Sequence, residues 1–367
     1  MGMELAIVGA SGFVGSRAVE WFGLGGRATV RPIVRSYASL ARVARFPLDC
    51  RIADAGDEAA LTEALRGCDM LLHSVVGNPQ LVVDTAAVAY RAAQAAGVRR
   101  LVFLSSASVH GQNPAAGTDE TSPLSDRQYF AYNNAKVRAE RKLQQLRRNG
   151  AVELVILRPS IVFGPRSRWV LELAKQLLEG SAYLVNGGTG ICNSIYVDNL
   201  LQAVELAATV AGIDGEVFLV GDRERVTWAE FYAPFARAFG VELDSLLRPE
   251  APAAFHKSWR DRLGSLRAAP ATQALLPLFP SRLKQLVKGA IAGWQQRPRP
   301  SGWRMPAPAS PQVPAEIACL QQCQYSLPWD KARRLMGYEP TVSFEEGCRR
   351  SIGWLDFAGY PVVHHDD

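Results

Sequence analysis

The sequence predicts an α/β fold, in which a doubly wound parallel sheet carries a smaller C-terminal lobe. Two observations predict it: apolar strand-like runs alternate with segments of helical periodicity as far as Leu157, and a glycine-rich loop follows the first apolar run. With 367 residues, of which 48% are hydrophobic, the chain is long enough for two domains and a substantial core. A disordered or collagen-like chain is therefore excluded.

The predicted elements alternate along the first part of the chain. Strands are expected at 3–8, 29–34, 51–54, 70–76, 100–105 and 153–157, and helices at 12–22, 58–66, 81–96 and 132–148. Such alternation implies parallel strands whose two faces are both covered by helices. Beyond Pro159 the elements become irregular and proline-rich, so we place the boundary of the C-terminal lobe there.

Composition and charge exclude several classes of protein. Lys+Arg 41 against Asp+Glu 35 gives a net charge of +6, and the excess is spread along the chain, which does not indicate nucleic-acid binding. The 6 cysteines form neither metal-type CxxC pairs nor a dense disulfide pattern, so we expect reduced thiols and no metal site. The start MGMELAIVGA lacks signal-peptide features, and no apolar run approaches the ~20 residues of a membrane span. We therefore expect a cytoplasmic protein.

A glycine-rich loop, with the sequence GASGFVG, lies directly between the first strand and the first helix. Gly9 permits the tight turn, Gly12 lets backbone N–H groups approach a pyrophosphate, and Gly15 lets helix and strand pack closely. In this context the loop is the dinucleotide fingerprint of a Rossmann-type fold rather than a simple turn. The loop residues predicted to contact a nicotinamide cofactor are Gly9, Ser11, Gly12, Phe13, Val14 and Gly15.

The end of the second strand indicates which dinucleotide is bound. In an NAD enzyme this strand usually ends in an acid that binds the ribose 2′-hydroxyl, but here it ends in Arg35 and Ser36. Because arginine suits a 2′-phosphate, we predict NADP, with NAD and a solvated Arg35 as the alternative. Asp54, at the end of the third strand, is predicted to contact the adenine, or else only caps the strand.

Three polar residues are predicted to carry the chemistry. Ser106 follows the strand at 100–105, while Tyr132 and Lys136 stand one helical turn apart on one face of a helix. A lysine ammonium beside a phenol favours the phenolate, so we expect Lys136 to lower the pKa of Tyr132 towards working pH. The tyrosine can then exchange a proton with a substrate alcohol, whose oxygen the serine hydroxyl holds.

The order of these motifs resembles the extended short-chain dehydrogenase/reductase family, also called the NAD-dependent epimerase/dehydratase family. Besides GxxGxxG, SSAS and YNNAK, four segments resemble motifs of that family: 69–73 its DxVxH strand, 157–165 its LRPxxxYGP segment, 195–199 its hVDD segment and 330–340 its KAxxxLGxxP segment. The resemblance covers most of the chain but not the stretch 251–314.

The resemblance implies a domain plan and further site residues. Residues 1–158 would form the Rossmann-type NAD(P)-binding domain, to which 190–222 returns, and 159–367 would form mainly a substrate-binding lobe. By the same resemblance Ser106, Tyr132 and Lys136 are catalytic, and the cofactor is also approached by Ser74, Val75, Tyr132, Lys136, Pro159 and Ile161. Substrate contacts would come from Ala107, Ser108, His110 and Arg166. The resemblance also implies a homodimer formed through the helices that include Tyr132.

Four positions depart from the family pattern and narrow the substrate. Ala107 and Ser108 stand where family dehydratases carry an Asp-Glu pair, which disfavours a 4,6-dehydratase. Ile161 and Cys192 stand where nucleotide-sugar epimerases carry an asparagine and an arginine that hold the diphosphate. Neither residue can replace an amide or a guanidinium as an anion donor. What remains resembles the reductase and 3β-hydroxysteroid dehydrogenase-like branches.

The sequence thus predicts hydride transfer between NADP(H) and a secondary alcohol or ketone of a non-nucleotide, hydrophobic, sterol-like substrate. One alternative is a nucleotide-sugar epimerase or 4-ketoreductase that holds its diphosphate with other residues, such as Arg166 or Arg168. A second alternative is a regulatory protein that binds NADP without catalysis. The intact set of Ser106, Tyr132 and Lys136 argues against the second alternative.

The stretch 251–314 is an apolar, proline-rich insertion. Within it the segment 281–295 predicts a cationic amphipathic helix, because Leu283, Leu286, Val287 and Ile291 line one helical face. We expect this helix to pack on the lobe, where the insertion could roof a hydrophobic pocket. The alternative is peripheral contact with a membrane surface.

Overall fold

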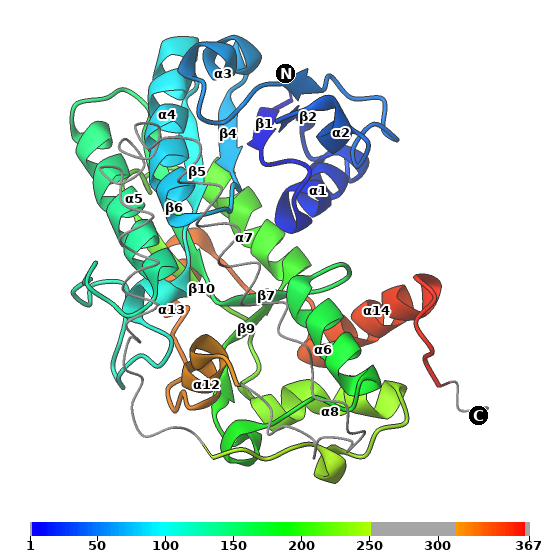
Figure 1. The fold of residues 1–367 in the computed structure, drawn as a ribbon. Coiled ribbons are helices and arrows are strands. Elements are labelled where there is room, and N and C mark those ends of the chain that lie inside the picture. The colour runs from blue at the N-terminus through cyan, green and yellow to red at the C-terminus, as the bar shows by residue number, and fades with distance from the viewer. Residues whose placement is uncertain (1, 251–312, 364–367) are drawn as a thin grey trace, which may run out of the picture. The chain divides into compact units, whose positions relative to one another are not determined.

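The computed structural model describes residues 2–250 and 313–363, which belong to one compact unit (Figure 1). The insertion at 251–314, with its amphipathic segment 281–295, lies almost entirely outside the described residues. In the described part no helix is long and apolar enough to cross a membrane.

A parallel sheet with 7 strands forms the centre of the described unit, in the order β10-β6-β5-β4-β1-β2-β3. The strands are β1 Glu4–Val8, β2 Thr29–Val34, β3 Arg51–Ile52, β4 Met70–His73, β5 Arg100–Leu104, β6 Glu153–Pro159 and β10 Val217–Val220. The chain runs outward from β1 to β2 and β3, then returns to the other side of β1 with β4. The strand order therefore reverses between β1 and β4, the point at which α/β sheets bind ligands at their carboxyl edge.

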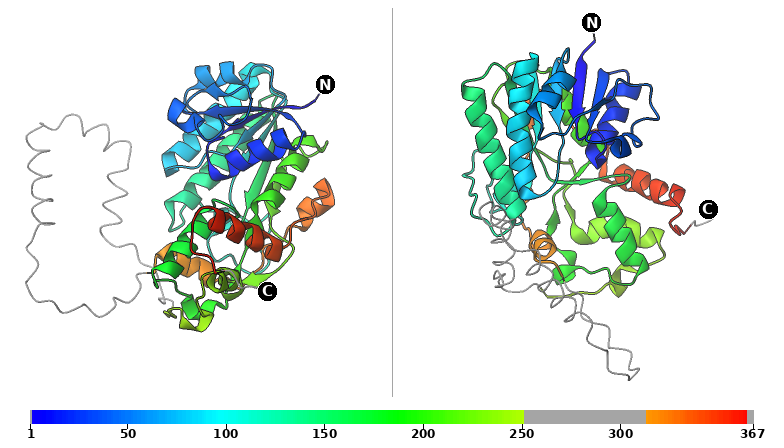
Figure 2. Two further views of the ribbon diagram at one scale, coloured as in Figure 1. Left: turned by 90° about the vertical axis from the view of Figure 1, so that its right-hand side faces the viewer. Right: turned by 45° about the horizontal axis from the view of Figure 1, so that its top comes forward.

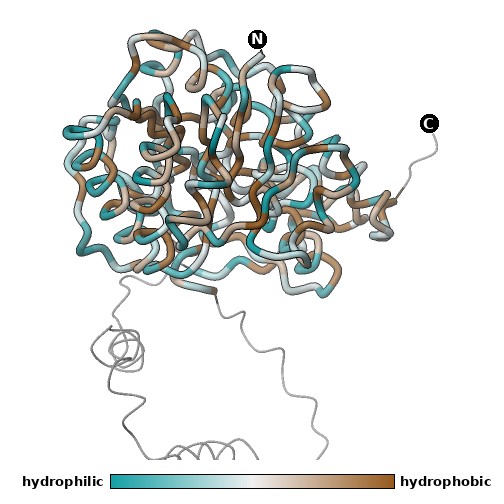
Figure 3. The backbone as a smooth tube through the Cα atoms, turned by 90° about the horizontal axis from the view of Figure 1, so that it is seen from above, coloured by the Kyte–Doolittle hydropathy of each residue, from teal (hydrophilic) through white to brown (hydrophobic). Residues whose placement is uncertain are grey.

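Helices cover both faces of this sheet, as the alternation of apolar runs predicts (Figure 2). One face packs on α3 Glu58–Leu65, α4 Pro79–Ala96 and α5 Ala131–Arg148. The other face packs on α1 Phe13–Val19, α7 Val197–Thr209 and α13 Asp330–Met336. Successive residues of β1 point to opposite faces, since Leu5 and Ile7 join one core and Ala6 and Val8 the other. Figure 3 shows the hydrophobic stretches of the backbone mainly in the interior and the hydrophilic stretches mainly at the periphery.

A smaller group of elements packs beside the carboxyl edge of the sheet around a third, aromatic core. Its short strands are β7 Ile161–Phe163, which pairs with β9 Ser194–Tyr196, and β8 Ile191–Cys192, which pairs with β11 Val226–Thr227. Its helices are α6 Arg168–Leu178, α8 Trp228–Ala238, α12 Ala315–Gln321 and α14 Phe344–Phe357. Phe163, Trp228 and Phe231 are fully buried in this core. Residues beyond Pro159 thus alternate between the two groups, because β10 joins the main sheet and α7 packs on it.

The doubly wound parallel sheet predicted from the sequence is confirmed. The differences lie at element ends: the third strand has only 2 residues, and the first helix continues into a π-helical turn, η1 Glu20–Leu24. Sequence analysis missed a short helix after β2, α2 Tyr37–Leu40, and a 3₁₀ turn after β5, η2 Ala107–His110. Both missed helices begin at a serine whose side chain accepts a backbone N–H, which is a local signal for a helix start.

Candidate active site

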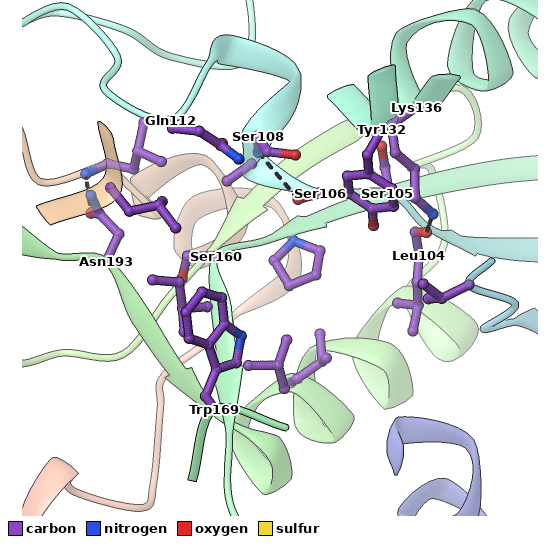
Figure 4. Close-up of a pocket in the computed structure, with 18 of the residues that line it drawn as sticks. Leu104, Ser105, Ser106, Ser108, Gln112, Tyr132, Lys136, Ser160, Trp169 and Asn193 are labelled. Atoms are coloured by element: carbon purple, nitrogen blue, oxygen red, sulfur yellow. Dashed lines mark hydrogen bonds between the residues drawn. The ribbon is translucent and has the colours of Figure 1, made fainter. Parts of the chain in front are cut away.

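A cavity of about 340 Å³ opens at the carboxyl edge of the sheet, between the glycine loop and the smaller group of elements (Figure 4). Of the predicted cofactor and catalytic residues, those that line it are Phe13, Val14, Ser74, Ser106, Tyr132, Lys136, Pro159 and Ile161. Gly9, Ser11, Gly12, Gly15, Arg35, Asp54 and Val75 are not part of its lining. The structure therefore brings the three predicted catalytic residues to one cavity that begins at the glycine loop.

At Gly9 and Gly15 the backbone of the glycine loop packs too closely for a side chain. Gly9 has a φ of +86°, and a Cβ there would lie 2.9 Å from the Ser74 hydroxyl oxygen. A Cβ on Gly15 would lie 2.2 Å from the Gly9 carbonyl oxygen. No side chain caps the start of α1, so its first backbone N–H groups are left to an outside acceptor. This cradle fits a dinucleotide pyrophosphate at the start of the helix.

Two arginines lie at the end where the adenosine of a dinucleotide is expected. Arg35 is exposed directly after β2, and Ser36 caps α2. Arg42 donates a hydrogen bond of 2.9 Å to the Ser11 carbonyl oxygen of the glycine loop. Sequence analysis missed Arg42, because no motif marks a contact made across the loop by a residue 31 positions later. Asp54 accepts a hydrogen bond of 2.8 Å from the Gly56 backbone N–H, as a cap would, and its contact with the adenine stays a prediction.

The catalytic candidates are held by β5, η2 and α5. Ser106 stands at the start of η2, and its Oγ accepts a 3.2 Å hydrogen bond from the Ser108 backbone N–H. Tyr132 and Lys136 lie one turn apart on α5, as predicted. The Lys136 ammonium is 1% exposed and donates a 2.7 Å hydrogen bond to the Leu104 carbonyl oxygen. Lys136 is thereby fixed beside the end of β5, two residues before the predicted catalytic Ser106.

The pKa values of Tyr132 and Lys136 differ from those expected from the sequence. Burial lowers the pKa of Lys136 to about 8. The pKa of Tyr132 is raised to about 12 by burial, and the Glu316 carboxylate adds to the rise. The predicted lowering by Lys136 is wrong for this arrangement, because the ammonium bonds to a carbonyl and lies 5.8 Å from the tyrosine ring centre. Tyr132 is therefore a protonated phenol, suited to donating a proton.

Arg158 and Glu140 form a buried ion pair, one turn along α5 from Lys136. Arg158 donates two hydrogen bonds, of 3.1 and 2.7 Å, to the carboxylate of Glu140, and the Ser105 hydroxyl bonds to the same carboxylate. His110 belongs to this network: its Nε2 lies 3.1 Å from Arg158, and burial followed by the Arg158 charge lowers its pKa to about 4. His110 does not line the cavity, contrary to the expected substrate contact. His110 is held beside the buried Arg158 guanidinium instead.

Of the other residues predicted to contact the substrate, some line the cavity and one does not. Ala107 and Ser108 line the cavity. Arg166 does not, and instead pairs with Glu20 at 3.2 Å, whereas the neighbouring Arg168 is exposed and lines the cavity.

Sequence analysis missed the wall contributed by the C-terminal segment. Residues from this segment that line the cavity are Glu316, Leu320, Cys323 and Leu327. Asn193 fixes the segment by donating to the Tyr325 carbonyl oxygen at 3.0 Å and accepting from the Leu327 N–H at 2.8 Å. Contacts between residues more than 130 positions apart leave no local pattern in a sequence, so no signal could have placed this wall.

Fold and site together define a nicotinamide-dinucleotide enzyme built on a Rossmann-type sheet. A family model described as "NAD dependent epimerase/dehydratase family" matches residues 5–221, more than half of the chain. The chain belongs to this family, as the motif order predicts.

Named relatives act on different substrates. The chain is 26% identical over 262 residues to N-acetyl-alpha-D-glucosaminyl-diphospho-ditrans,octacis-undecaprenol 4-epimerase of Escherichia coli O157:H7, covering 68% of this chain and 76% of that one. It is 29% identical over 271 residues to 3 beta-hydroxysteroid dehydrogenase/Delta 5-->4-isomerase of Mycobacterium tuberculosis, covering 71% and 62%.

Solved structures show the same fold. The UDP-glucose 4-epimerase of Thermotoga maritima with UDP-glucose matches with a TM-score of 0.68 at 18% identity, covering 97% of this chain and 99% of that one. The dTDP-glucose 4,6-dehydratase DesIV of Streptomyces venezuelae with NAD matches with a TM-score of 0.69 at 20% identity, covering 97% of each chain. At such identities the likeness shows the fold alone.

Proposed function

We propose that the protein transfers a hydride between NADP(H) and a secondary alcohol or ketone of a hydrophobic, sterol-like substrate that carries no nucleotide. The proposal rests on one observation: Ser106, Tyr132 and Lys136 line the same cavity, and the other walls of this cavity are mostly apolar. Relatives named as steroid dehydrogenases support the hydrophobic substrate.

In the proposed ketone reduction each of the three side chains has its own role. A nicotinamide cofactor, when bound, would supply the hydride for the carbonyl carbon. Tyr132, protonated because its pKa is raised, donates its proton to the carbonyl oxygen. The Ser106 hydroxyl donates a hydrogen bond to the same oxygen as negative charge develops on it. Lys136, fixed on the Leu104 carbonyl, stands one turn from Tyr132 where it can orient the cofactor ribose.

The charges around the cavity support a substrate without a diphosphate. Ile161 and Cys192 are both buried at the positions where epimerases anchor phosphates. The Glu316 carboxylate in the cavity wall repels an anion, and Lys136 is already bonded to Leu104. In the described lining this leaves Arg168 as a cation with no partner in the structure.

Arg168 is also the observation that favours a second candidate, an epimerase or ketoreductase of diphosphate-linked sugars. Its exposed guanidinium at the start of α6 could take the place of the missing anchors. The relative that is named as a 4-epimerase of a diphospho-undecaprenol sugar supports this candidate.

Calorimetric titration of the NADP-loaded protein with UDP, dTDP, GDP and CDP separates the two candidates. We expect no measurable binding of any of the four nucleotides, because the cavity offers one unpaired cation against one carboxylate. Binding that is abolished by Arg168→Ala would overturn the proposal and select the sugar-diphosphate candidate. Turnover of a sterol alcohol with NADP⁺ is the complementary positive result.

If the protein prefers NADP, replacing the arginines near the adenosine end should lower its affinity for NADPH more than its affinity for NADH. Replacing Arg35 and Arg42 together by alanine should weaken NADPH binding about 10- to 100-fold, because each removes a charge-assisted hydrogen bond to the 2′-phosphate. NADH affinity should fall much less, because NADH carries no 2′-phosphate and is affected only through the lost Arg42 contact with the Ser11 carbonyl. Fluorescence titration with both cofactors is the measurement, and Arg45→Ala is the control, since Arg45 pairs with Glu20 instead. Equal wild-type affinities for NADH and NADPH would contradict the preference.

A further inference from the structure

Polar atoms without partners gather in the wall of the cavity, outside the set of Ser106, Tyr132 and Lys136. The Oγ of Ser108, the Oε1 of Gln112 and the Oγ of Ser160 are buried and have no hydrogen-bond partner in the structure, and all three residues line the cavity. A buried polar atom without a partner costs free energy, so native proteins rarely keep several of them together. Their gathering in one cavity points to a ligand that supplies the missing partners.

The orientation of the Gln112 amide shows which partner is missing. Its Nε2 donates a 2.9 Å hydrogen bond to the Glu316 carboxylate. Because a carboxylate only accepts hydrogen bonds, the amide nitrogen must face Glu316, and Oε1 is left as a free acceptor. Gln112 is 7% exposed, so bulk water does not satisfy this acceptor. The missing partner is therefore a hydrogen-bond donor.

Two of the three residues, Ser108 and Gln112, stand close to Ser106. The Ser108 backbone N–H is bonded to the Ser106 hydroxyl oxygen, and Gln112 follows on the same loop after η2. Figure 4 shows Gln112 and Ser108 together beside Ser106, with Ser160 further along the cavity. The serine hydroxyls can donate or accept, whereas the Gln112 oxygen can only accept. This set matches a hydroxyl group, which both donates and accepts.

We propose that Ser108, Gln112 and Ser160 form a substrate subsite that binds a second hydroxyl group, separate from the oxygen that reacts at Tyr132. The proposal rests on the proposed function and narrows its substrate class to neutral ring alcohols or ketones that carry a further hydroxyl. A substrate carboxylate at this place would meet the Gln112 oxygen and the Glu316 charge, and is rejected.

Matched ring ketones test the subsite. The probes are cyclohexanone, 4-hydroxycyclohexanone and 4-oxocyclohexanecarboxylate, each with NADPH, and the readout is the ratio of their kcat/KM values. For the wild type we expect the hydroxyketone to exceed cyclohexanone about tenfold or more, as expected for one buried hydrogen bond. The carboxylate should fall below cyclohexanone.

Three variants test whether the hydroxyketone preference depends on the proposed subsite. Gln112→Met keeps the length of the side chain and removes the amide, so the hydroxyketone preference should fall to about twofold or less. Gln324→Met, on an exposed residue outside the cavity, should keep the wild-type ratio. Ser160→Ala removes a single hydroxyl, should also lower the ratio, and serves if Gln112→Met does not fold.

The outcomes separate this subsite from the proposed function. Turnover of cyclohexanone without a hydroxyl preference, or a preference that survives both Gln112→Met and Ser160→Ala, overturns the subsite alone. Turnover of a sterol with reduction of none of the three ring ketones also overturns the subsite alone. Failure to turn over either a sterol or a ring ketone, with NADPH shown to bind, overturns the proposed function and the subsite with it.

Discussion

Replacing Tyr132 by phenylalanine should lower kcat for ketone reduction by about 10²- to 10⁴-fold, the range that positioned proton donors contribute. The substitution removes only the phenolic hydroxyl, for which the structure gives no hydrogen bond. The ring, which packs against the core shared by α4 and α5, is kept. NADPH affinity and the unfolding midpoint should therefore stay close to the wild-type values. Stopped-flow measurement of NADPH oxidation, with a fluorescence titration of the cofactor, checks both expectations.

The control for this variant is Tyr360→Phe, which makes the same change at a residue outside the cavity. It should leave kcat unchanged. A Tyr132→Phe enzyme with full turnover would remove Tyr132 from the chemistry, and Ser106 would then be the remaining proton donor in the set. Loss of cofactor binding in Tyr132→Phe would instead show that the phenol holds the cofactor.

The sheet, and the meeting of Ser106, Tyr132 and Lys136 in one cavity, were predictable because their signals are local. A strand buried on both faces reads as an apolar run, and the turn from Tyr132 to Lys136 is fixed by helical geometry. The glycine spacing reports contacts within a single turn, such as the close approach of Gly15 to Gly9. These signals survive in the sequence because each is produced by residues a few positions apart.

The substrate side of the cavity was not predictable for the converse reason. Gln112 and Glu316 are 204 positions apart in the chain. The residues around each of them give no sign of the hydrogen bond that joins the two. The pKa of Tyr132 also failed as a prediction, since burial and Glu316 outweigh the lysine one turn away. His110 was placed in the pocket by resemblance, but its position beside Arg158 depends on where β6 lies relative to η2. Tertiary placement decides each of these cases.

Replacing Arg158 by methionine should lower the free energy of unfolding by about 3–5 kcal/mol, the usual result of removing one partner from a buried ion pair. Arg158 and Glu140 have side chains that are each 4% exposed, so the Glu140 carboxylate would be left in the interior without its counter-charge. Chemical denaturation, with the midpoint and slope measured together, gives the change. The matched control is Arg66→Met, whose pair with Glu63 is 68% and 75% exposed and should be worth about 0–1 kcal/mol.

The double variant Arg158→Met/Glu140→Leu separates the cost of an unpaired charge from the value of the pair. Because neither charge of the Arg158–Glu140 pair remains, it should recover much of the stability lost in Arg158→Met. Turnover should not recover with it, since Glu140 stands one turn beyond Lys136 and its charge raises the pKa of Lys136 against the effect of burial. Recovery of both would show that the ion pair only fills the interior. Recovery of stability alone would show that Glu140 helps keep Lys136 charged.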